Sequence, residues 1–231
     1  AWNDHRHLEA YYAITGIGAV LHTVNPRLHD DQLVYILNHA ADRIVFVDPD
    51  FWPIAERLAE RCPGVERWIR LDDDYESFVA SEPLAAWPQH DDWAAATHSY
   101  TSGTTGKPKG VLQSHRAIVL QTWATCTTAG HHVNTGESVL LAVPMYHVNG
   151  WAIPFASAMS GAKLVLPGPD LGPEALTELI NSEEVTLSAV VPTIWLAVVQ
   201  HLQRTGQDIP SLRRIAVGGA AAPRSLIDTL E

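Results

Sequence analysis

Short runs of apolar residues alternate along the chain with longer segments whose apolar positions recur at helical spacing. The short runs predict β-strands at 43–48, 67–71, 138–143, 163–166, 186–191 and 214–217. Several of these runs are apolar almost throughout, which is typical of strands that are covered on both faces. The alternation of such strands with helices predicts an α/β fold of mostly parallel sheets flanked by helices.

The helical spacing predicts helices at 32–41, 51–61, 114–127, 173–182 and 193–204, and a last helix that opens at Pro223. Ser114 can cap the helix that it precedes, and Pro173 and Pro223 suit a first helical turn. The segment 72–92 has weak periodicity, several acidic residues and two prolines, so we expect a surface connection with one short helix. Its acidic run, Asp72 to Asp74, is expected to be a solvated turn rather than a metal cluster, and a subdomain seam is expected near 72–96.

Composition and charge narrow the class of protein. The 231 residues are 46% hydrophobic and 18% charged, which excludes disorder, and the net charge of −11 argues against a nucleic-acid partner. Two cysteines, Cys62 and Cys126, are too few for a disulfide framework, so we expect a cytoplasmic protein. No apolar run approaches the ~20 residues of a membrane span. The opening residues do not resemble a signal peptide, and we expect them to lie inside a longer protein.

One loop carries most of the chemical information. Residues 100–110 read Tyr-Thr-Ser-Gly-Thr-Thr-Gly-Lys-Pro-Lys-Gly and follow a short β-like stretch at 97–99. Glycines let backbone N–H groups turn toward an anion, hydroxyls donate hydrogen bonds or ligate magnesium, and ammonium groups offset phosphate charge. The chain has three lysines against twelve arginines, and two of the three lysines lie here. The loop therefore predicts a polyphosphate site, with a glycine- and threonine-rich surface turn as the alternative.

The spacing in this loop disfavours a Walker-type P-loop. That motif needs a glycine five residues before Gly106 and a hydroxyl residue after Lys107, whereas this chain has Thr101 and Pro108 there. Proline has no hydroxyl to give to magnesium. A P-loop NTPase is therefore not expected.

The same eleven residues resemble the phosphate-loop signature of the adenylate-forming, AMP-binding superfamily. The resemblance extends along nearly the whole chain, through residues 1–3, 6–9, 18–23, 25–28, 144–151, 191–193 and 218–220. Within the superfamily the chain is most similar to bacterial medium- and long-chain fatty-acyl-CoA synthetases and their thioether-acid relatives. The resemblance implies that residues 1–231 are an incomplete part of the large N-terminal domain.

The implied reaction has two steps and uses ATP, magnesium and CoA. A carboxylic acid and ATP give an acyl-adenylate and pyrophosphate, and CoA then displaces AMP to give a thioester. The alternatives are a ligase for a short or thioether acid such as a methylthiopropanoate, a phosphotransferase that releases ADP, and a non-catalytic nucleotide-binding fragment. The expected partners are small molecules, and a homodimer is left open.

The resemblance also implies roles for individual residues. His147 is expected to line the pocket for the acyl group and carboxylate as the catalytic residue, and Thr101 to ligate magnesium. Trp151 is expected to share a helix face with His147, and the segment 191–195 to border the acyl pocket, although the spacing of Trp195 also favours the core. The residues expected to bind ATP or to border its site are Thr101, Ser102, Gly103, Thr104, Thr105, Gly106, Lys107, Lys109, Val148, Trp151, Gly218, Gly219 and Ala220.

The remaining expectations concern residues away from the phosphate loop and family elements that this sequence does not contain. The histidines at positions 5, 7, 131 and 132 are expected at the surface. Small residues at 152, 156, 158 and 161 would leave room for an extended acyl group. The family's second magnesium ligand, ribose-binding aspartate, hinge and small C-terminal domain with the adenylation lysine are expected beyond Glu231. We therefore expect these 231 residues to be unable to complete the reaction alone.

Overall fold

In the computed structural model, the described residues are 1–80, 86–101 and 106–230. They form two compact units. Unit 1 contains Ala1–Trp2, Arg6–Ile118 and Tyr146–Asn149, and unit 2 contains Asn3–His5, Val119–Met145 and Gly150 onward. The expected positions Ser102, Gly103, Thr104 and Thr105 lie outside the described residues.

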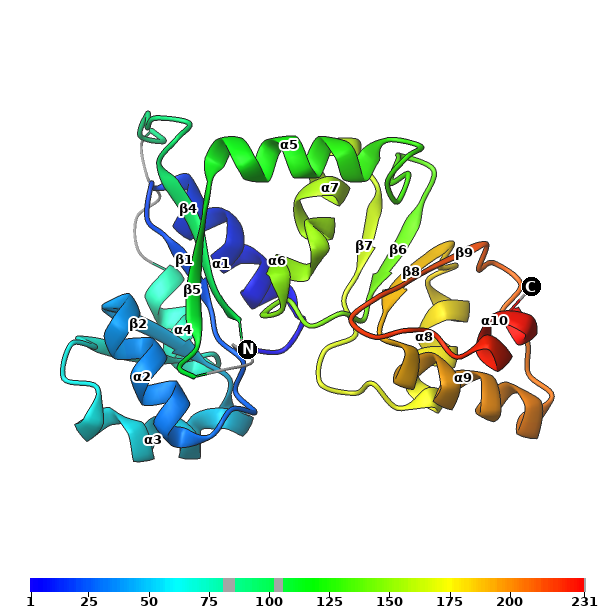
Figure 1. Cartoon of the computed structure of the whole chain (residues 1–231), viewed down its shortest axis with the longest axis horizontal. Coiled ribbons are helices and arrows are strands. Elements are labelled where there is room, and N and C mark those ends of the chain that lie inside the picture. The colour runs from blue at the N-terminus through cyan, green and yellow to red at the C-terminus, as the bar shows by residue number, and fades with distance from the viewer. Residues whose placement is uncertain (81–85, 102–105, 231) are drawn as a thin grey trace. The chain divides into compact units, whose positions relative to one another are not determined.

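Unit 1 holds two small sheets and the helices beside them (Figure 1). One sheet has the order β1-β4-β5, with β1 parallel and β5 antiparallel to β4, and the other is the parallel pair β2-β3. Its elements are α1 (His5–Gly16), β1 (Leu21–Thr23), α2 (Asp30–Ala40), β2 (Ile44–Val47), η1 (Pro49–Phe51), α3 (Trp52–Leu58), η2 (Ala59–Arg61), β3 (Arg67–Arg70), α4 (Asp73–Val79), β4 (Ala95–Thr101) and β5 (Lys109–Ser114).

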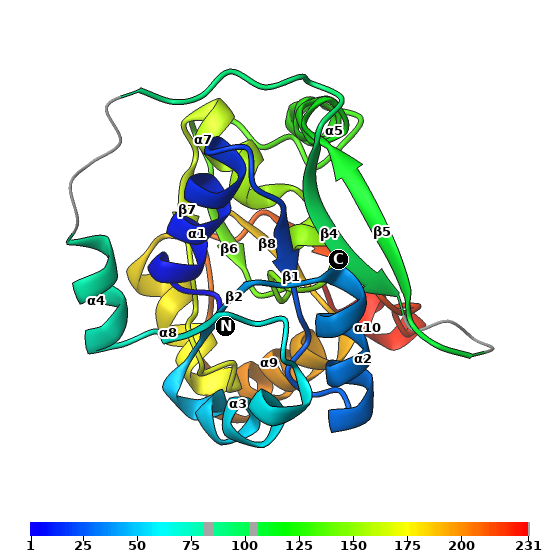
Figure 2. The ribbon, with the colours of Figure 1, turned by 90° about the vertical axis from the view of Figure 1, so that its left-hand side faces the viewer.

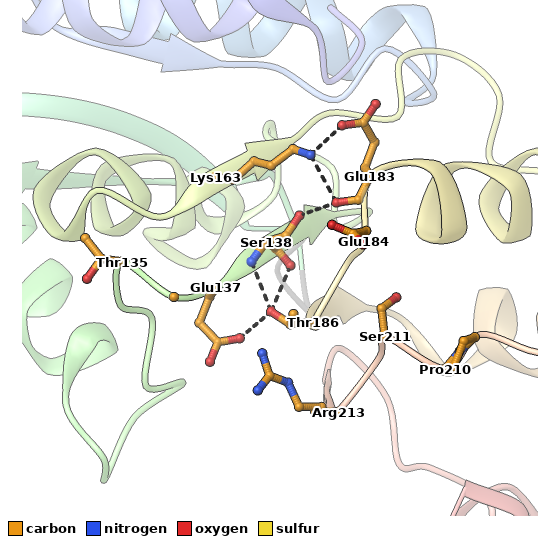
Figure 3. Close-up of a pocket in the computed structure, with 11 residues that line it drawn as sticks. Thr135, Glu137, Ser138, Lys163, Glu183, Glu184, Thr186, Pro210, Ser211 and Arg213 are labelled. Atoms are coloured by element: carbon orange, nitrogen blue, oxygen red, sulfur yellow. Dashed lines mark hydrogen bonds and ion pairs between the residues drawn. The ribbon is translucent and has the colours of Figure 1, made fainter.

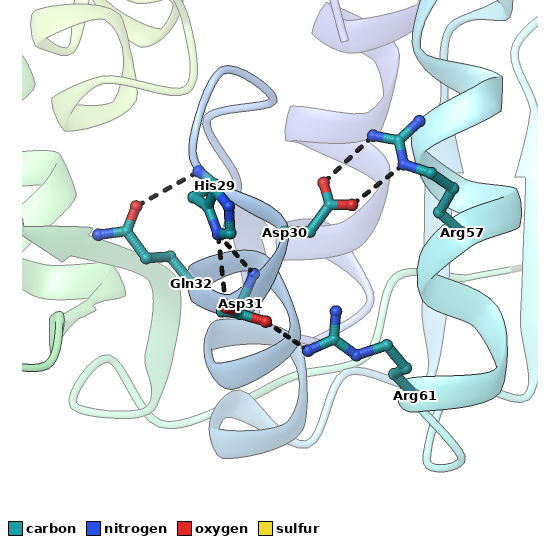
Figure 4. A network of polar contacts seen from close by, with 6 residues as sticks. All are labelled: His29, Asp30, Asp31, Gln32, Arg57 and Arg61. Atoms are coloured by element: carbon teal, nitrogen blue, oxygen red, sulfur yellow. Dashed lines mark hydrogen bonds and ion pairs between the residues drawn. The ribbon is translucent and has the colours of Figure 1, made fainter.

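Helix α2 is fixed at its start by polar contacts (Figure 4). A capping box joins the side chain of His29 to the backbone of the first turn and the side chain of Gln32 to the backbone of His29. Arg57 binds Asp30 at 3.0 Å, and Arg61 binds Asp31 at 2.6 Å. Hydrogen bonds from these guanidinium groups lower the pKa of both carboxyl groups. The apolar side of α2, with Leu33 and Leu37, packs in a core with residues of α3.

Unit 2 is built on a fully parallel sheet of order β7-β6-β8-β9 (Figure 1). Every residue of β6 and β8 is buried, and the core beside them includes Trp195, Ile180 and Leu226. Burial of each large apolar side chain contributes about 1.5–3 kcal/mol. Two helices, α5 (His115–Cys126) and α6 (Val148–Trp151), begin in unit 1 and end in unit 2. The other elements of unit 2 are β6 (Ser138–Leu141), α7 (Ile153–Ser160), β7 (Lys163–Val165), α8 (Pro173–Ser182), β8 (Leu187–Val190), α9 (Pro192–Thr205), β9 (Arg214–Val217) and α10 (Arg224–Leu230).

The observed elements confirm the α/β class and all six strands predicted from apolar runs. The six predicted helices are also present, and the side chain of Ser114 accepts a hydrogen bond from the Ala117 N–H at 3.2 Å, as a cap does. The prediction missed α1, β1, β5 and α7. No helix in the described part of the chain is both long enough and apolar enough to cross a membrane.

The segment 72–96, where a subdomain seam is expected, packs against α1. Its described residues all lie in unit 1. Tyr75 of α4 is buried and donates a hydrogen bond to Glu9, and the ring of Trp87 lies against Gly16. These contacts hold both flanks of the segment to α1.

Candidate functional site

The predicted phosphate loop joins two paired antiparallel strands, β4 and β5, which run side by side (Figure 2). Tyr100 is the register partner of Gly110, and Thr101 is the partner of Lys109. Thr101, Gly106, Lys107 and Lys109 are all exposed, so these described ends of the loop are neither buried nor helical. Gly106 has φ +127°, a conformation that side chains with a Cβ rarely adopt. The hairpin thus presents the ends of the loop to solvent.

The register of the hairpin divides its side chains between two faces. Side chains alternate along a strand, and directly opposed residues share a face. Thr97, Ser99 and Thr101 therefore lie on one face of β4, and His98 and Tyr100 on the other. Because Lys109 is opposite Thr101, its side chain belongs to the threonine face. This places a hydroxyl and an ammonium together where the loop begins and ends.

The second face carries a cluster of rings, which we call the ring cluster: His22, His98, Tyr100 and His39. The His98 ring lies 4.8 Å from Tyr100 and 5.0 Å from His22, between ring centroids. Nδ1 of His39 lies 2.6 Å from the Tyr100 hydroxyl, and Nδ1 of His22 lies 2.7 Å from a carboxylate oxygen of Asp42. Burial lowers the pKa of His98 and raises the pKa of Tyr100, which favours the neutral form of both.

Lys107 contacts the neighbouring helix α2. Its Nζ lies 5.0 Å from the centroid of the Tyr35 ring, a cation–π contact. Tyr35 and His39 are four residues apart on α2, and their rings lie 5.2 Å apart. The helix therefore connects Lys107 to the ring cluster. The i, i+4 spacing of Tyr35 and His39 was a signal for this shared face that the sequence analysis did not use.

His147 lies on a short segment that is fastened to the sheet of the hairpin. The side chain of Thr23 on β1 donates to the carbonyl of Tyr146 at 3.4 Å. The side-chain amide of Asn149 donates to the Thr97 hydroxyl at 2.9 Å and to the Gln113 carbonyl oxygen at 2.8 Å. His147 itself is exposed, between these two anchors. Asn149 was not predicted as a site residue, because its partners lie 52 and 36 positions away.

The prediction that Trp151 shares a helix face with His147 is wrong, because α6 begins at Val148. Val148, Asn149, Gly150, Trp151 and Ala152 have φ between +48° and +60°, so α6 is wound in the left-handed sense. For residues with a Cβ this conformation costs roughly 1–2 kcal/mol each. His147 precedes α6 and lies outside it, so the two residues are not four apart on one helix.

In unit 2, Trp151 lies against the turn that follows β9. A Cβ added to Gly218 would lie 2.6 Å from Cη2 of Trp151, so only glycine fits beside the indole. Gly219 has φ +83°, and Ala220 is exposed. The ring of His131 is also stacked on Trp151, with the ring centroids 6.2 Å apart. The turn after β9 and the Trp151 indole are therefore in close contact within unit 2.

Two histidines that we expected at the surface are not fully exposed. His131 is half-buried and stacks on Trp151, and His7 is buried in unit 1 beside the carbonyl of Trp2, 2.9 Å from its Nδ1. Burial lowers the pKa of His7 to about 3. His5 and His132 are exposed, as expected. His7 occupies one of the buried positions of helix α1. Its burial was not expected because this helix was not predicted.

A separate hollow of about 490 Å³ lies in unit 2 at the amino ends of the parallel strands (Figure 3). Its lining includes Ser138, Lys163, Thr186 and Arg213. Gly218 and Gly219 follow the carboxyl end of β9, where parallel sheets place ligands, so the hollow is at the other edge. Lys163 is already 2.6 Å from the Glu183 carboxylate. We do not assign this hollow to the candidate site.

The acyl-pocket candidates divide between core and surface. Trp195 is 2% exposed and packs in the core of unit 2, as its spacing predicted. Ala152 and Ala156 are buried, whereas Ala158 and Gly161 are exposed. Buried small residues can border a cavity, but exposed ones cannot make room inside the fold.

Comparison with known proteins gives a family and its members. A model described as "AMP-binding enzyme" matches residues 1–231. The chain is 46% identical to a long-chain-fatty-acid–CoA ligase of Thermus thermophilus, over 100% of this chain and 43% of that protein. It is 45% identical to a 3-methylmercaptopropionyl-CoA ligase of Ruegeria pomeroyi, over 98% of this chain and 45% of that protein. The chain thus spans less than half of the length of these relatives.

A solved structure has the same fold at lower identity. The crystal structure of a long-chain-fatty-acid–CoA ligase from Archaeoglobus fulgidus matches with a TM-score of 0.88 and 22% identity. The match covers 99% of this chain and 46% of that one.

Proposed function

The chain belongs to the family of AMP-binding enzymes, and on that premise we propose that it forms part of an AMP-forming acyl-CoA ligase. A carboxylate oxygen attacks the α-phosphorus of ATP, the bond to the bridging oxygen breaks, and acyl-adenylate and pyrophosphate form. The CoA thiol then loses its proton and attacks the acyl carbon, and AMP leaves as the thioester forms. Both steps depend on alignment and charge neutralisation more than on a general acid or base.

The observation that supports this proposal is the pairing of Thr101 with Lys109, both exposed, at the ends of β4 and β5 that the loop joins. A hydroxyl and an ammonium at the two ends of a glycine-rich loop suit a triphosphate. We assign the β- and γ-phosphates to this loop, through Thr101, Ser102, Gly103, Thr104, Thr105, Gly106, Lys107 and Lys109. The position of Lys109 opposite Thr101 gives it a stronger basis than the sequence alone did.

Magnesium fits this site only together with the nucleotide. Among the residues that the structure describes, no three His, Cys, Asp or Glu side chains are grouped to hold a metal. Magnesium keeps several waters and commonly binds through one or two protein oxygens plus substrate phosphates. The exposed Thr101 hydroxyl would supply one such oxygen. When bound, the ion would neutralise phosphate charge.

The remaining assignments concern the acid. We assign His147 and Val148 to the region of the carboxylate and acyl group, because both are exposed on the segment anchored to β1 and the hairpin. Trp151 and the turn at Gly218, Gly219 and Ala220 would border the nucleotide and acyl sites. The close fit of Trp151 against Gly218 supports a shared role.

We propose a medium- or long-chain fatty acid as the substrate, and a short thioether acid as the alternative. The name of the Thermus relative specifies a long-chain fatty acid, and the name of the Ruegeria relative specifies a methylmercapto acid. These relatives are nearly equally similar to the chain, so identity does not choose between the substrates. A cytoplasmic location and a homodimer belong to the same proposal.

The test uses the full-length protein that contains these residues. Carboxylate-dependent exchange of labelled pyrophosphate into ATP is expected, with AMP and pyrophosphate as products. Release of ADP would overturn the ligase assignment in favour of a phosphotransferase. Pyrophosphate release measured with fatty acids of increasing length, and with a thioether acid, would identify the substrate class. The isolated 231-residue chain should show no exchange, and robust exchange by it would contradict the view that the chain is an incomplete part of the enzyme.

A further inference from the structure

Asn149 forms a buried polar link between the segment that carries His147 and both strands of the hairpin. It is 2% exposed, and Thr97 is 0% exposed. Its amide group donates to Thr97 on β4 and to Gln113 on β5, at 2.9 and 2.8 Å. The Thr97 hydroxyl also donates to the same Gln113 oxygen at 3.1 Å. One side chain therefore contacts both strands at once.

The strand register relates this link to the proposed phosphate site. Thr97 and Gln113 are direct partners, and two pairs further along the same face are Thr101 and Lys109. Four residues of an extended strand span about 13 Å. At its other end the link is two residues from His147. The hairpin thus connects the partners of Asn149 to the ends of the phosphate loop, and both residue pairs lie on the same face of the hairpin.

The hydrogen bonds of Asn149 also hold an unfavourable backbone conformation. Asn149 has φ +50° and lies in the left-handed turn that begins at Val148. A backbone in this region persists only where surrounding contacts determine it. The two hydrogen bonds are such contacts, because they fix the side chain of a residue inside the turn. Without them, the position of His147 relative to the hairpin would be free to relax.

We propose that Asn149 is a positioning residue that holds the His147 segment in register with the phosphate-loop hairpin. This inference rests on the proposed ligase function. The carboxylate beside His147 and the triphosphate on the loop must be aligned for attack, and small displacements reduce the rate strongly. Asn149 touches neither of them and acts through Thr97 and Gln113.

The test is a set of variants of the full-length enzyme, measured by pyrophosphate exchange. Asn149→Ala should lower kcat for adenylation by at least ~10-fold, because alignment is lost. The KM for magnesium-ATP should change by less than about threefold, since the phosphate contacts remain. Gln113→Leu, at a half-buried position, should show the same split to a smaller degree. The double variant should be no slower than Asn149→Ala alone, because both changes break one link.

A matched control separates positioning from stability. Thr177→Val removes a different buried side-chain hydrogen bond, from Thr177 to the Pro173 carbonyl at 2.7 Å on α8. It should lower the melting temperature and leave both kinetic constants unchanged at assay temperature. If Asn149→Ala behaves like this control, or if its effect adds fully to that of Gln113→Leu, the inference is overturned.

Two further experiments distinguish a failure of the proposed function from a failure of the positioning role. Lys107→Ala tests the proposed function itself: a wild-type exchange rate in that variant would contradict the phosphate site, whatever Asn149 does. If Lys107→Ala is slow while Asn149→Ala is normal, only the positioning role fails. Should Asn149→Ala not fold, Gln113→Leu and Thr97→Val carry the test, with the same expected loss of kcat at nearly constant KM. Unchanged kcat in both would overturn the inference.

Discussion

The ammonium of Lys107 lies 5.0 Å from the centre of the Tyr35 ring, so a lysine of the proposed phosphate loop is held by helix α2. The N-terminal ion pairs of α2 with Arg57 and Arg61 fix that helix (Figure 4). A cation–π contact at an exposed site contributes about 0.5–1 kcal/mol. The loop is therefore not the only determinant of where its charge lies.

Tyr35→Leu should raise the KM for magnesium-ATP about two- to fivefold in the full-length enzyme, because Lys107 loses the ring that restricts it. Tyr35→Phe keeps the ring and should stay close to wild type. Steady-state kinetics with varied ATP would measure both. Equal KM values for the leucine and phenylalanine variants would show that the ring does not position Lys107.

Changes in the loop should affect adenylation directly. Thr101→Val, Lys107→Ala and Lys109→Ala should each slow pyrophosphate exchange by at least ~10-fold, since each removes a metal or charge contact. Thr101→Ser keeps the hydroxyl and is the matched control, expected to retain most of the activity. Wild-type rates in the first three variants would place the phosphate site elsewhere.

Gly218→Ala should disturb Trp151, because the new methyl group would lie 2.6 Å from the indole. Such overpacking typically costs about 1–3 kcal/mol. We expect a lower melting temperature and slower adenylation. Trp151→Phe removes the atoms that clash with this methyl group. The double variant should therefore have nearly the same melting temperature as the single Trp151→Phe variant. Additive losses in the double variant would argue against this contact.

Buried His7 should make stability depend on pH in the acid range. Its pKa is about 3 in the folded chain because of burial, whereas an unfolded histidine has a pKa of about 6.5. Between these values the unfolded state binds the additional proton, so the free energy of unfolding decreases as pH falls from about 6.5 toward 3. His7→Gln cannot be protonated and keeps a donor for the Trp2 carbonyl. In denaturant unfolding measured from pH 7 to 4, the free energy of unfolding should decrease less for this variant than for the wild type. An equal decrease in both proteins would contradict the prediction.

The parts of the fold that follow from the sequence are those set by local patterns. The strands β6 and β8 are apolar throughout and were predicted within two residues of their observed ends. Strand β5 was missed because Gly110 and the polar residues around it lack the apolar signal of a buried strand. Helix α1 was missed for a related reason: its histidines and tyrosines do not form a clear apolar face.

The candidate site could be predicted only in part, because its motifs are local and its connections are not. The loop at 100–110 and the glycine turn after β9 were visible in the sequence. The contacts of Asn149 and of Lys107 depend on which strands pair and which helix covers them. The left-handed turn could not be foreseen either, since valine and tryptophan have no local preference for positive φ.

Val148 illustrates what that turn implies for the chemistry of the chain. It is a β-branched residue, 46% exposed, with φ +48°. Glycine would adopt this backbone without steric strain, whereas the left-handed conformation costs valine roughly 1–2 kcal/mol. Folding alone gives no reason for an isopropyl group at this position. The proposed place of Val148 beside the acyl group would give this side chain a role in ligand binding.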